Sequence, residues 1–120
     1  MSDALSDLAA QLREEDTPIS PHVVDTPPPA EDSWVIEAVR EGYLLHYGQS
    51  RLLAGHDPDL ALLAGDYLYA LGIERLAKLG DTKAVLALAD LIGTSAQLHT
   101  EGHEDELPAV WDRTVAALTS

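Results

Sequence analysis

The segment Leu60-Ala61-Leu62-Leu63-Ala64-Gly65-Asp66-Tyr67-Leu68-Tyr69-Ala70-Leu71 is an apolar run interrupted by one Gly-Asp pair, and it predicts a helix. A carboxylate is costly to bury there unless a group pairs with it or water reaches it. Asp66 therefore indicates a bond to a hydroxyl group or an Arg side chain of an adjacent helix, or a polar group facing a partner or a cavity. Gly65 lowers helix propensity by about 1 kcal/mol relative to Ala, which suggests that another helix approaches closely.

Residues typical of helix ends bound the helix that contains this segment. Asp57-Pro58 combines a cap residue with Pro at the first helical position, so the helix is expected to begin there and to stop at Gly80. Asp81 is the expected cap of the next helix, which carries apolar residues as far as Gly102. These two helices form the centre of the expected fold.

The remaining sequence from Ser33 onward also predicts helices. Ser33 is a candidate cap for a helix that runs to about Tyr47, residues 48–56 form a loop, and a final helix begins near Pro108. The sequence has no strand signals, no repeat of fixed period and no heptads long enough for a coiled coil. The expected fold class is therefore all-α, a helical bundle with an extended N-terminal arm.

The expected arm is residues 1–32, and residues 33–120 are the expected helical domain. Residues 2–15 can form a short amphipathic helix, with Ser2 or Asp3 as its cap and leucines at helical spacing. Prolines in residues 16–32 remove backbone donors and favour extended geometry, which predicts a poorly packed linker. The first helix is either a frayed end or an arm that docks on a partner, and we expect residues 33–120 to fold without it.

Composition narrows the class of protein. The chain has 120 residues, no Cys and a formal net charge of −14. This charge argues against nucleic acid and anionic lipid as partners, and the lack of Cys excludes disulfides and thiolate sites. No basic segment precedes an apolar core at the N-terminus, and no segment has the roughly eighteen apolar residues of a membrane span. A cytoplasmic location is the expectation.

The helix that contains the central segment is apolar on two sides. One stripe consists of Leu60, Leu63, Ala64, Tyr67, Leu68 and Leu71, and the second of Leu62, Tyr69, Ala70 and Ile73. A helix with two apolar sides must be buried on both, and so short a chain cannot easily surround it. We therefore expect an oligomer, because monomers rarely expose large apolar patches. The candidate interface or tunnel residues are Leu60, Leu63, Ala64, Gly65, Asp66, Tyr67 and Leu71.

Histidines and tyrosines offer weaker candidate sites. His99 and His103 are four residues apart and could face one metal ion on a continuous helix, but Gly102 lies between them. A solvated helix end explains this pattern better. The four tyrosines, at positions 43, 47, 67 and 69, could crowd one end of the bundle as packing residues or as a tunnel floor. No spacing supports a catalytic triad.

Residues from Ala61 to Gly102 resemble part of the trans-polyprenyl diphosphate synthases. The motif Ala61-Leu62-Leu63-Ala64-Gly65-Asp66-Tyr67-Leu68 is similar to the family's A-x-L-x-G-D-Y-L helix. Leu76-Ala77-Lys78-Leu79-Gly80-Asp81 is similar to the L-A-x-L-G-D motif that follows it. The resemblance implies a truncated isoprenoid synthase fold, in which these helices line a hydrocarbon tunnel and contribute to a subunit interface.

The family's catalytic motifs are missing. Its D-D-x-x-D motifs hold Mg²⁺ against a diphosphate group, and the nearest sequences here are Glu14-Glu15-Asp16 and Glu104-Asp105-Glu106. The resemblance therefore implies a non-catalytic small subunit, similar to those of the hexaprenyl and heptaprenyl diphosphate synthases. A catalytic large subunit would hold Mg²⁺, and this chain, without a cofactor of its own, would complete the tunnel and influence product length. The alternative is a homo-oligomeric structural or apolar-ligand-binding protein.

Overall fold

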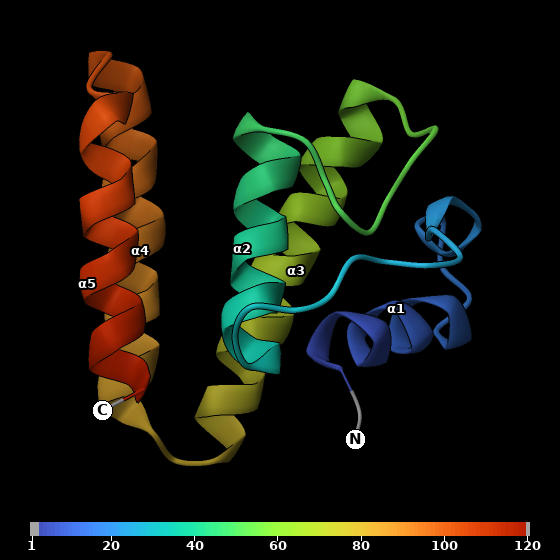
Figure 1. Cartoon of the computed structure of the whole chain (residues 1–120), viewed down its shortest axis with the longest axis horizontal. Helices are drawn as coiled ribbons and strands as arrows, with labels where there is room; N and C mark the ends of the chain where they lie inside the picture. The colour runs from blue at the N-terminus through green and yellow to red at the C-terminus, as the bar shows by residue number, and fades with distance from the viewer. Residues whose placement is uncertain (1–2, 120) are drawn as a thin grey trace. The chain divides into compact units, whose positions relative to one another are not determined.

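The computed structural model describes residues 3–119, and within that range the chain is helical (Figure 1). The elements are α1 (Ala4–Glu14), η1 (Ser20–His22), α2 (Trp34–Tyr47), α3 (Pro58–Lys78), α4 (Thr82–Glu101), η2 (Glu104–Glu106) and α5 (Leu107–Thr119), where η marks a short 3₁₀ helix. The expected all-α class is confirmed. No helix in this range is long and apolar enough to cross a membrane.

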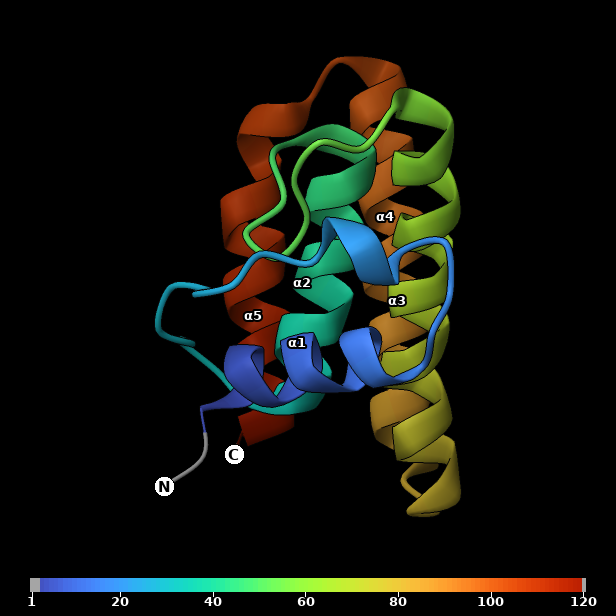
Figure 2. The same cartoon turned by 90° about the vertical axis from the view of Figure 1, so that its right-hand side faces the viewer.

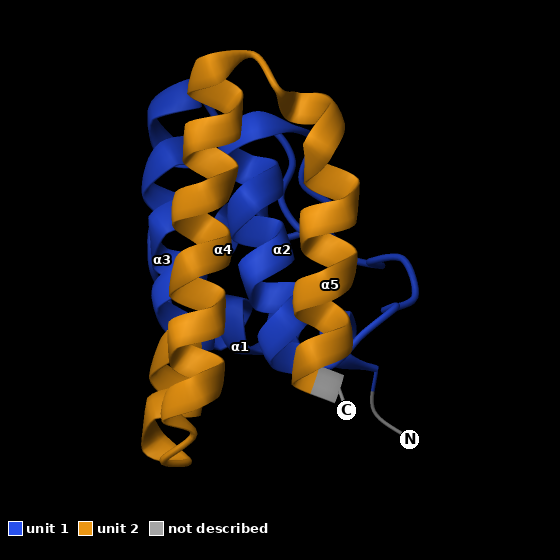
Figure 3. Cartoon of the chain, turned by 90° about the vertical axis from the view of Figure 1, so that its left-hand side faces the viewer, with its two compact units in different colours: residues 1–72 blue, residues 73–120 orange. Residues whose placement is uncertain are grey.

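The chain forms two compact units, residues 1–72 and residues 73–120 (Figure 3). The boundary lies inside α3, so the first unit holds α1, α2 and most of α3. In the second unit, α4 and α5 pack against each other as a helical hairpin. The division expected after residue 32 falls inside the first unit.

The helix ends follow the cap residues of the sequence. Asp57 and Asp81 accept main-chain N–H bonds at 2.7 and 3.1 Å, in the first turns of α3 and α4. Gly102 ends α4 with a φ of 75°, in the left-handed region that Gly adopts without strain. Ser33 precedes α2 as expected, but its side chain makes no capping bond. Ser2, the other candidate cap of the first helix, lies outside the described residues, and Asp3 caps α1.

α1 belongs to the core of the first unit (Figure 2). Its leucines have no exposed surface, and they pack in one cluster whose buried members are Leu5, Leu8, Ala9, Leu12, Ile19, Ala38, Leu45, Leu52, Leu53, Ala64 and Leu68. The expectation of a frayed helix and a poorly packed linker is wrong. Prolines keep the linker extended, but an extended linker can still return α1 to the side of α2.

Specific hydrogen bonds fix the linker to α1. The main-chain N–H of Ala30 donates to Asp3 Oδ2 at 2.8 Å, and the hydroxyl of Ser20 donates to the carbonyl of Leu12 at 2.6 Å. The Arg13 guanidinium donates to two main-chain carbonyls of the linker. The linker is therefore part of the first unit's structure, in contrast to the expectation from its proline content.

Candidate functional site

The structure divides the candidate interface residues into three groups. Ala64 and Gly65 are buried, while Leu60, Tyr67 and Leu71 are half-buried against the core of the first unit. Leu63 and Asp66 are exposed, Leu63 at 61%. These residues share α3 but not one environment. Their role at an interface or a tunnel remains a prediction.

One side of α3 is open in this chain. Leu62 is 53% exposed, and Leu63 beside it is exposed to a similar extent. Both lie in the middle of the apolar segment, whereas Ala64 and Leu68 on the opposite side are fully buried. Leu63 belongs to the first of the two apolar stripes expected from the sequence and Leu62 to the second, so each stripe keeps an exposed leucine.

The inward side of α3 packs closely on α2 through glycines. A Cβ atom at Gly65 would lie 2.7 Å from the His46 ring, and one at Gly42 would lie 2.8 Å from the carbonyl oxygen of Gly65. A Cβ atom at Gly72 would lie 2.8 Å from Val39 Cγ2. The close helix approach predicted from Gly65 is therefore confirmed.

Asp66 pairs with a histidine of α2. His46 Nε2 lies 3.0 Å from Asp66 Oδ1, and the Asp66 side chain remains 75% exposed. The sequence predicted a hydroxyl group or an arginine as the partner of Asp66, and this identity was wrong. An adjacent helix does supply the partner, as predicted. Water also reaches this carboxylate, so the apolar run never buries it.

Aromatic rings surround the His46 side of this contact. The His46 ring stacks on Tyr69 at a centroid distance of 5.4 Å, and Tyr43 and Tyr47 lie 5.2 Å apart beside it. Burial, followed by the charges of Tyr47, Tyr43 and Asp66, raises the pKa of the Tyr69 hydroxyl. Three of the four tyrosines thus gather near one histidine. The Tyr69 hydroxyl stays protonated at neutral pH and can act only as a hydrogen-bonding group.

The fourth tyrosine lines a groove on the other edge of α3. Thr17, Pro18, Ile19, Leu63 and Tyr67 surround an open space of about 220 Å³, and its exposed wall is apolar. Two of these residues were candidates from the sequence, and the other three belong to the linker that was expected to be poorly packed. The groove exists because the linker returns to α3.

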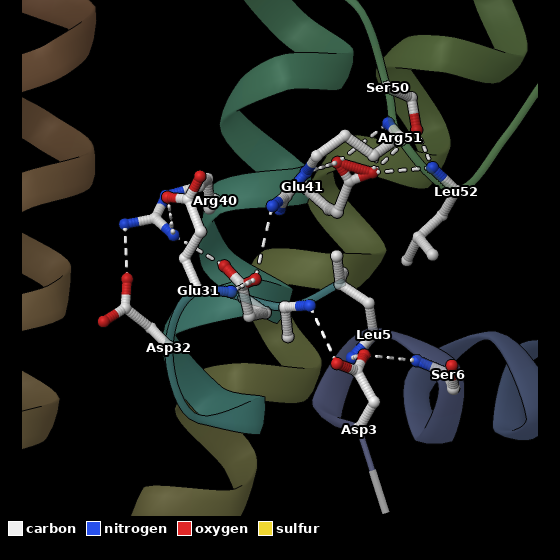
Figure 4. Close-up of polar contacts among 12 residues, drawn as sticks. Asp3, Leu5, Ser6, Glu31, Asp32, Arg40, Glu41, Ser50, Arg51 and Leu52 are labelled. Carbon is white, nitrogen blue, oxygen red and sulfur yellow. Dashed lines mark hydrogen bonds and ion pairs between the residues drawn. The ribbon is translucent and has the colours of Figure 1, made fainter. Parts of the chain in front are cut away.

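Two buried carboxylates were missed by the sequence analysis. Glu41 has no exposed surface, and it accepts bonds from Ser50 Oγ at 2.9 Å and from the main-chain N–H groups of Arg51 at 2.8 Å and Leu52 at 3.0 Å (Figure 4). The Arg51 Nε–H donates to the same carboxylate at 3.3 Å. Glu41 therefore fastens the loop after α2 to the helix itself.

Glu37 lies one turn earlier on α2 and is equally buried. It accepts from Arg40 at 2.6 Å, from Arg51 at 3.2 Å and from the main-chain N–H of Glu31 at 3.0 Å. Arg40 in turn pairs with Asp32 at 2.9 Å (Figure 4). The bonds from Arg51 and Glu31 hold the loop and the linker to α2, while the bond from Arg40 lies within the helix. Two glutamates four residues apart in an otherwise apolar helix, with arginines nearby, were the signal in the sequence.

The histidines near the end of α4 face separate carboxylates. His99 Nδ1 lies 3.7 Å from Glu104 Oε1, while His103 Nδ1 lies 2.9 Å from Glu106 Oε2. The bond to Glu106 raises the pKa of His103. Among residues 3–119 no three His, Cys, Asp or Glu side chains are placed to hold a metal ion together. The helix ends at Gly102 between the two histidines, as the sequence indicated.

Comparison of the chain with protein-family models, with curated proteins and with solved structures gives no match. The observations that bear on function are the sequence motifs and the geometry around α3. The open side of α3, Leu62 and Leu63, is the feature of the first unit that its own packing does not explain. The buried glutamates, in contrast, are fully accounted for by the loops that they hold.

Proposed function

We propose that this chain is a non-catalytic subunit of a heteromeric polyprenyl diphosphate synthase and that the open side of α3 binds the catalytic subunit. The observation that carries the proposal is the exposure of Leu62 and Leu63, at 53% and 61%. These leucines lie within the segment that resembles the synthase family. Apolar side chains at adjacent exposed positions are typical of a surface that a partner covers.

In the proposed complex the two subunits divide the work. The catalytic subunit supplies the Mg²⁺ ions and the groups that bind both diphosphates. This chain supplies apolar surface that extends the tunnel for the growing hydrocarbon, and so influences product length. The closed hydrogen-bonding of Glu37 and Glu41 supports a structural use of the carboxylates on α2.

Co-expression tests the proposal. The chain is produced together with a polyprenyl diphosphate synthase from the same organism that carries both D-D-x-x-D motifs, and the mass of the purified complex and its product length are measured. We expect a stable complex whose products differ in length from those of the catalytic subunit alone. Leu62→Gln should weaken the complex, because Gln is a good helix former but removes exposed apolar surface. Leu86→Gln is the matched control, since Leu86 is 64% exposed on α4.

Two results would overturn the proposal. One is Mg²⁺-dependent condensation of isopentenyl diphosphate with an allylic diphosphate by the isolated chain. The other is a homo-oligomer of the isolated chain that Leu62→Gln dissociates, with no binding to any synthase. That second result would establish the homo-oligomeric alternative.

A further inference from the structure

We propose that the groove between the linker and α3 receives apolar side chains of a partner segment in which lysines or arginines flank those side chains. The groove is lined by Thr17, Pro18, Ile19, Leu63 and Tyr67 and has a volume of about 220 Å³. Its apolar wall accepts aliphatic or aromatic side chains. The charge around it determines what else the partner must carry.

The first part of the rim is acidic and belongs to the end of α1. Glu14, Glu15 and Asp16 directly precede Thr17, and both Glu14 and Asp16 are exposed. Arg13 is the nearest base in the sequence, and its guanidinium is engaged by the carbonyls of Val24 and Asp25. Three carboxylates stand beside one guanidinium here, so this side of the groove carries an excess of negative charge.

The second part of the rim is acidic too and belongs to α3. Asp59 lies four residues before Leu63 and Asp66 lies three residues after it, so helical geometry places all three on one side of the helix. Asp59 is exposed, and Asp66 stays 75% exposed although it contacts His46. Leu63 is thus an apolar residue between two carboxylates that face solvent.

An apolar centre within a charged rim is the usual anatomy of a protein–protein interface. Opposite charge on the two rims speeds association and selects the partner, whereas like charges face to face cost several kcal/mol. A second copy of this chain is a poor occupant, because it would bring the same acidic rim and a net charge of −14. A basic, amphipathic segment of a different protein satisfies both the groove and the rim.

This inference deepens the proposed function, on which it rests only for the identity of the partner. It specifies that the partner's binding segment is basic and apolar, whichever protein supplies it. A test with a synthetic peptide therefore separates the two proposals. If the peptide does not bind but a stable synthase complex forms, the groove proposal is overturned and the proposed function stands. If the peptide binds but no synthase complex forms, the proposed function is overturned and the groove proposal stands.

The experiment uses the full chain and an amphipathic helical peptide built from Leu and Lys, with a Leu and Glu peptide of the same pattern as its counterpart. Amide NMR spectra of the chain are recorded during each titration. We expect saturable binding of the Leu–Lys peptide, with the largest shifts at Ile19, Leu63 and Tyr67, and no binding of the Leu–Glu peptide.

Variants separate the groove from general charge attraction. Leu63→Gln should weaken binding of the Leu–Lys peptide about tenfold, as expected when one large apolar side chain loses its burial. Leu86→Gln, at an equally exposed leucine of α4, should leave binding unchanged. Equal binding by both variants, or shifts centred on other acidic surfaces, would overturn the proposal.

The rim is tested by removing charge. Asp16 has a φ of 52°, which Asn tolerates well, so Asp16→Asn combined with Asp59→Asn removes two charges without straining the backbone. This double variant should bind the Leu–Lys peptide more weakly at low ionic strength and like the parent near 1 M salt, where the Debye length is about 3 Å. Asp90→Asn, at an exposed position of α4, is the control. An unchanged affinity of the double variant at low salt, or dimerisation of the parent chain that Leu63→Gln abolishes, would contradict the inference.

Discussion

The carboxylate of Glu41 receives the main-chain N–H of Arg51 at 2.8 Å and the guanidinium Nε–H of the same residue at 3.3 Å. One residue of the loop is thus held twice by one side chain of α2. Arg51 also reaches Glu37 at 3.2 Å, so the same arginine joins both buried carboxylates. The position of the loop after α2 depends on this relationship.

Glu41→Ala is expected to lower the free energy of unfolding by about 1 to 3 kcal/mol, because it removes the acceptor of the Arg51 main-chain N–H and one of the two carboxylates that bind the Arg51 guanidinium. Urea unfolding followed by circular dichroism measures the change. Glu74→Ala is the control, since Glu74 pairs with Lys78 at an exposed site, and such pairs contribute about 0.3 to 0.5 kcal/mol. Similar losses in the two variants would contradict the structural role of Glu41.

Gly42→Ala is expected to destabilise the chain by about 1 to 3 kcal/mol, because the new Cβ atom would lie 2.8 Å from the carbonyl oxygen of Gly65. Gly93→Ala is the matched control, because a Cβ atom there would meet nothing within 4 Å beyond its chain neighbours and the backbone of its own helix. It should stabilise α4 by up to about 1 kcal/mol through helix propensity alone. Thermal unfolding of both variants measures the difference, and a stabilising Gly42→Ala would mean that α2 and α3 do not approach so closely.

Leu8→Ala is expected to lower the free energy of unfolding by about 2 to 5 kcal/mol, as for other leucines without exposed surface. Removal of residues 1–32 should abolish cooperative unfolding of the first unit. The reason is that the leucines of α1 share one buried cluster with residues of α2 and α3. Leu86→Ala, at an exposed position, should change stability by less than about 0.5 kcal/mol. A truncated chain with a sharp melting transition would restore the idea of a dispensable arm.

The stabilising contribution of Asp3 should be lost at acid pH. The hydrogen bond from the Ala30 main-chain N–H is the largest cause that holds the pKa of Asp3 below its ordinary value of 3.8. Its stabilisation is therefore complete above about pH 3.8 and is lost as the pH falls through the lower folded value. Melting temperatures of the parent and Asp3→Asn, compared from neutral to acid pH, should converge at low pH. A constant difference would contradict the bond.

The contribution of His103 to stability has the opposite pH dependence. Its bond to Glu106 raises the pKa of the imidazole above 6.5, so the stabilisation is present below about pH 6.5 and is lost as the pH rises through the folded value. The melting temperatures of the parent and His103→Gln should therefore converge at alkaline pH. NMR titration of the imidazole measures the pKa directly, and a value below 6.5 would contradict this prediction.

Much of the fold was predictable because local signals decided it. Asp57, Asp81 and Gly102 act through their own turns, so the ends of α3 and α4 could be located from the sequence. The close approach at Gly65 was also predictable, since a glycine in a helix has few other uses. The partner of Asp66 was not, because any of several residues on a neighbouring helix could occupy that site.

The packing of α1 could not be predicted from local signals. The linker's proline content describes its backbone but not where it leads, and the burial of Ile19 depends on contacts with distant residues. The buried pair Glu37 and Glu41 was missed for a related reason. Their spacing is visible in the sequence, but their donors come from the loop after α2 and from the linker before it.

The place of α1 in the core has a consequence for synthesis on the ribosome. Leu5, Leu8 and Leu12 leave the exit tunnel before the rest of their cluster, and Ala64 and Leu68 are made more than fifty residues later. At translation rates of about 5 to 20 residues per second, the apolar side of α1 waits for several seconds before its cluster can close. During that interval the nascent chain exposes three leucines that the finished protein hides completely, so chaperone binding to the first dozen residues should precede folding of the first unit.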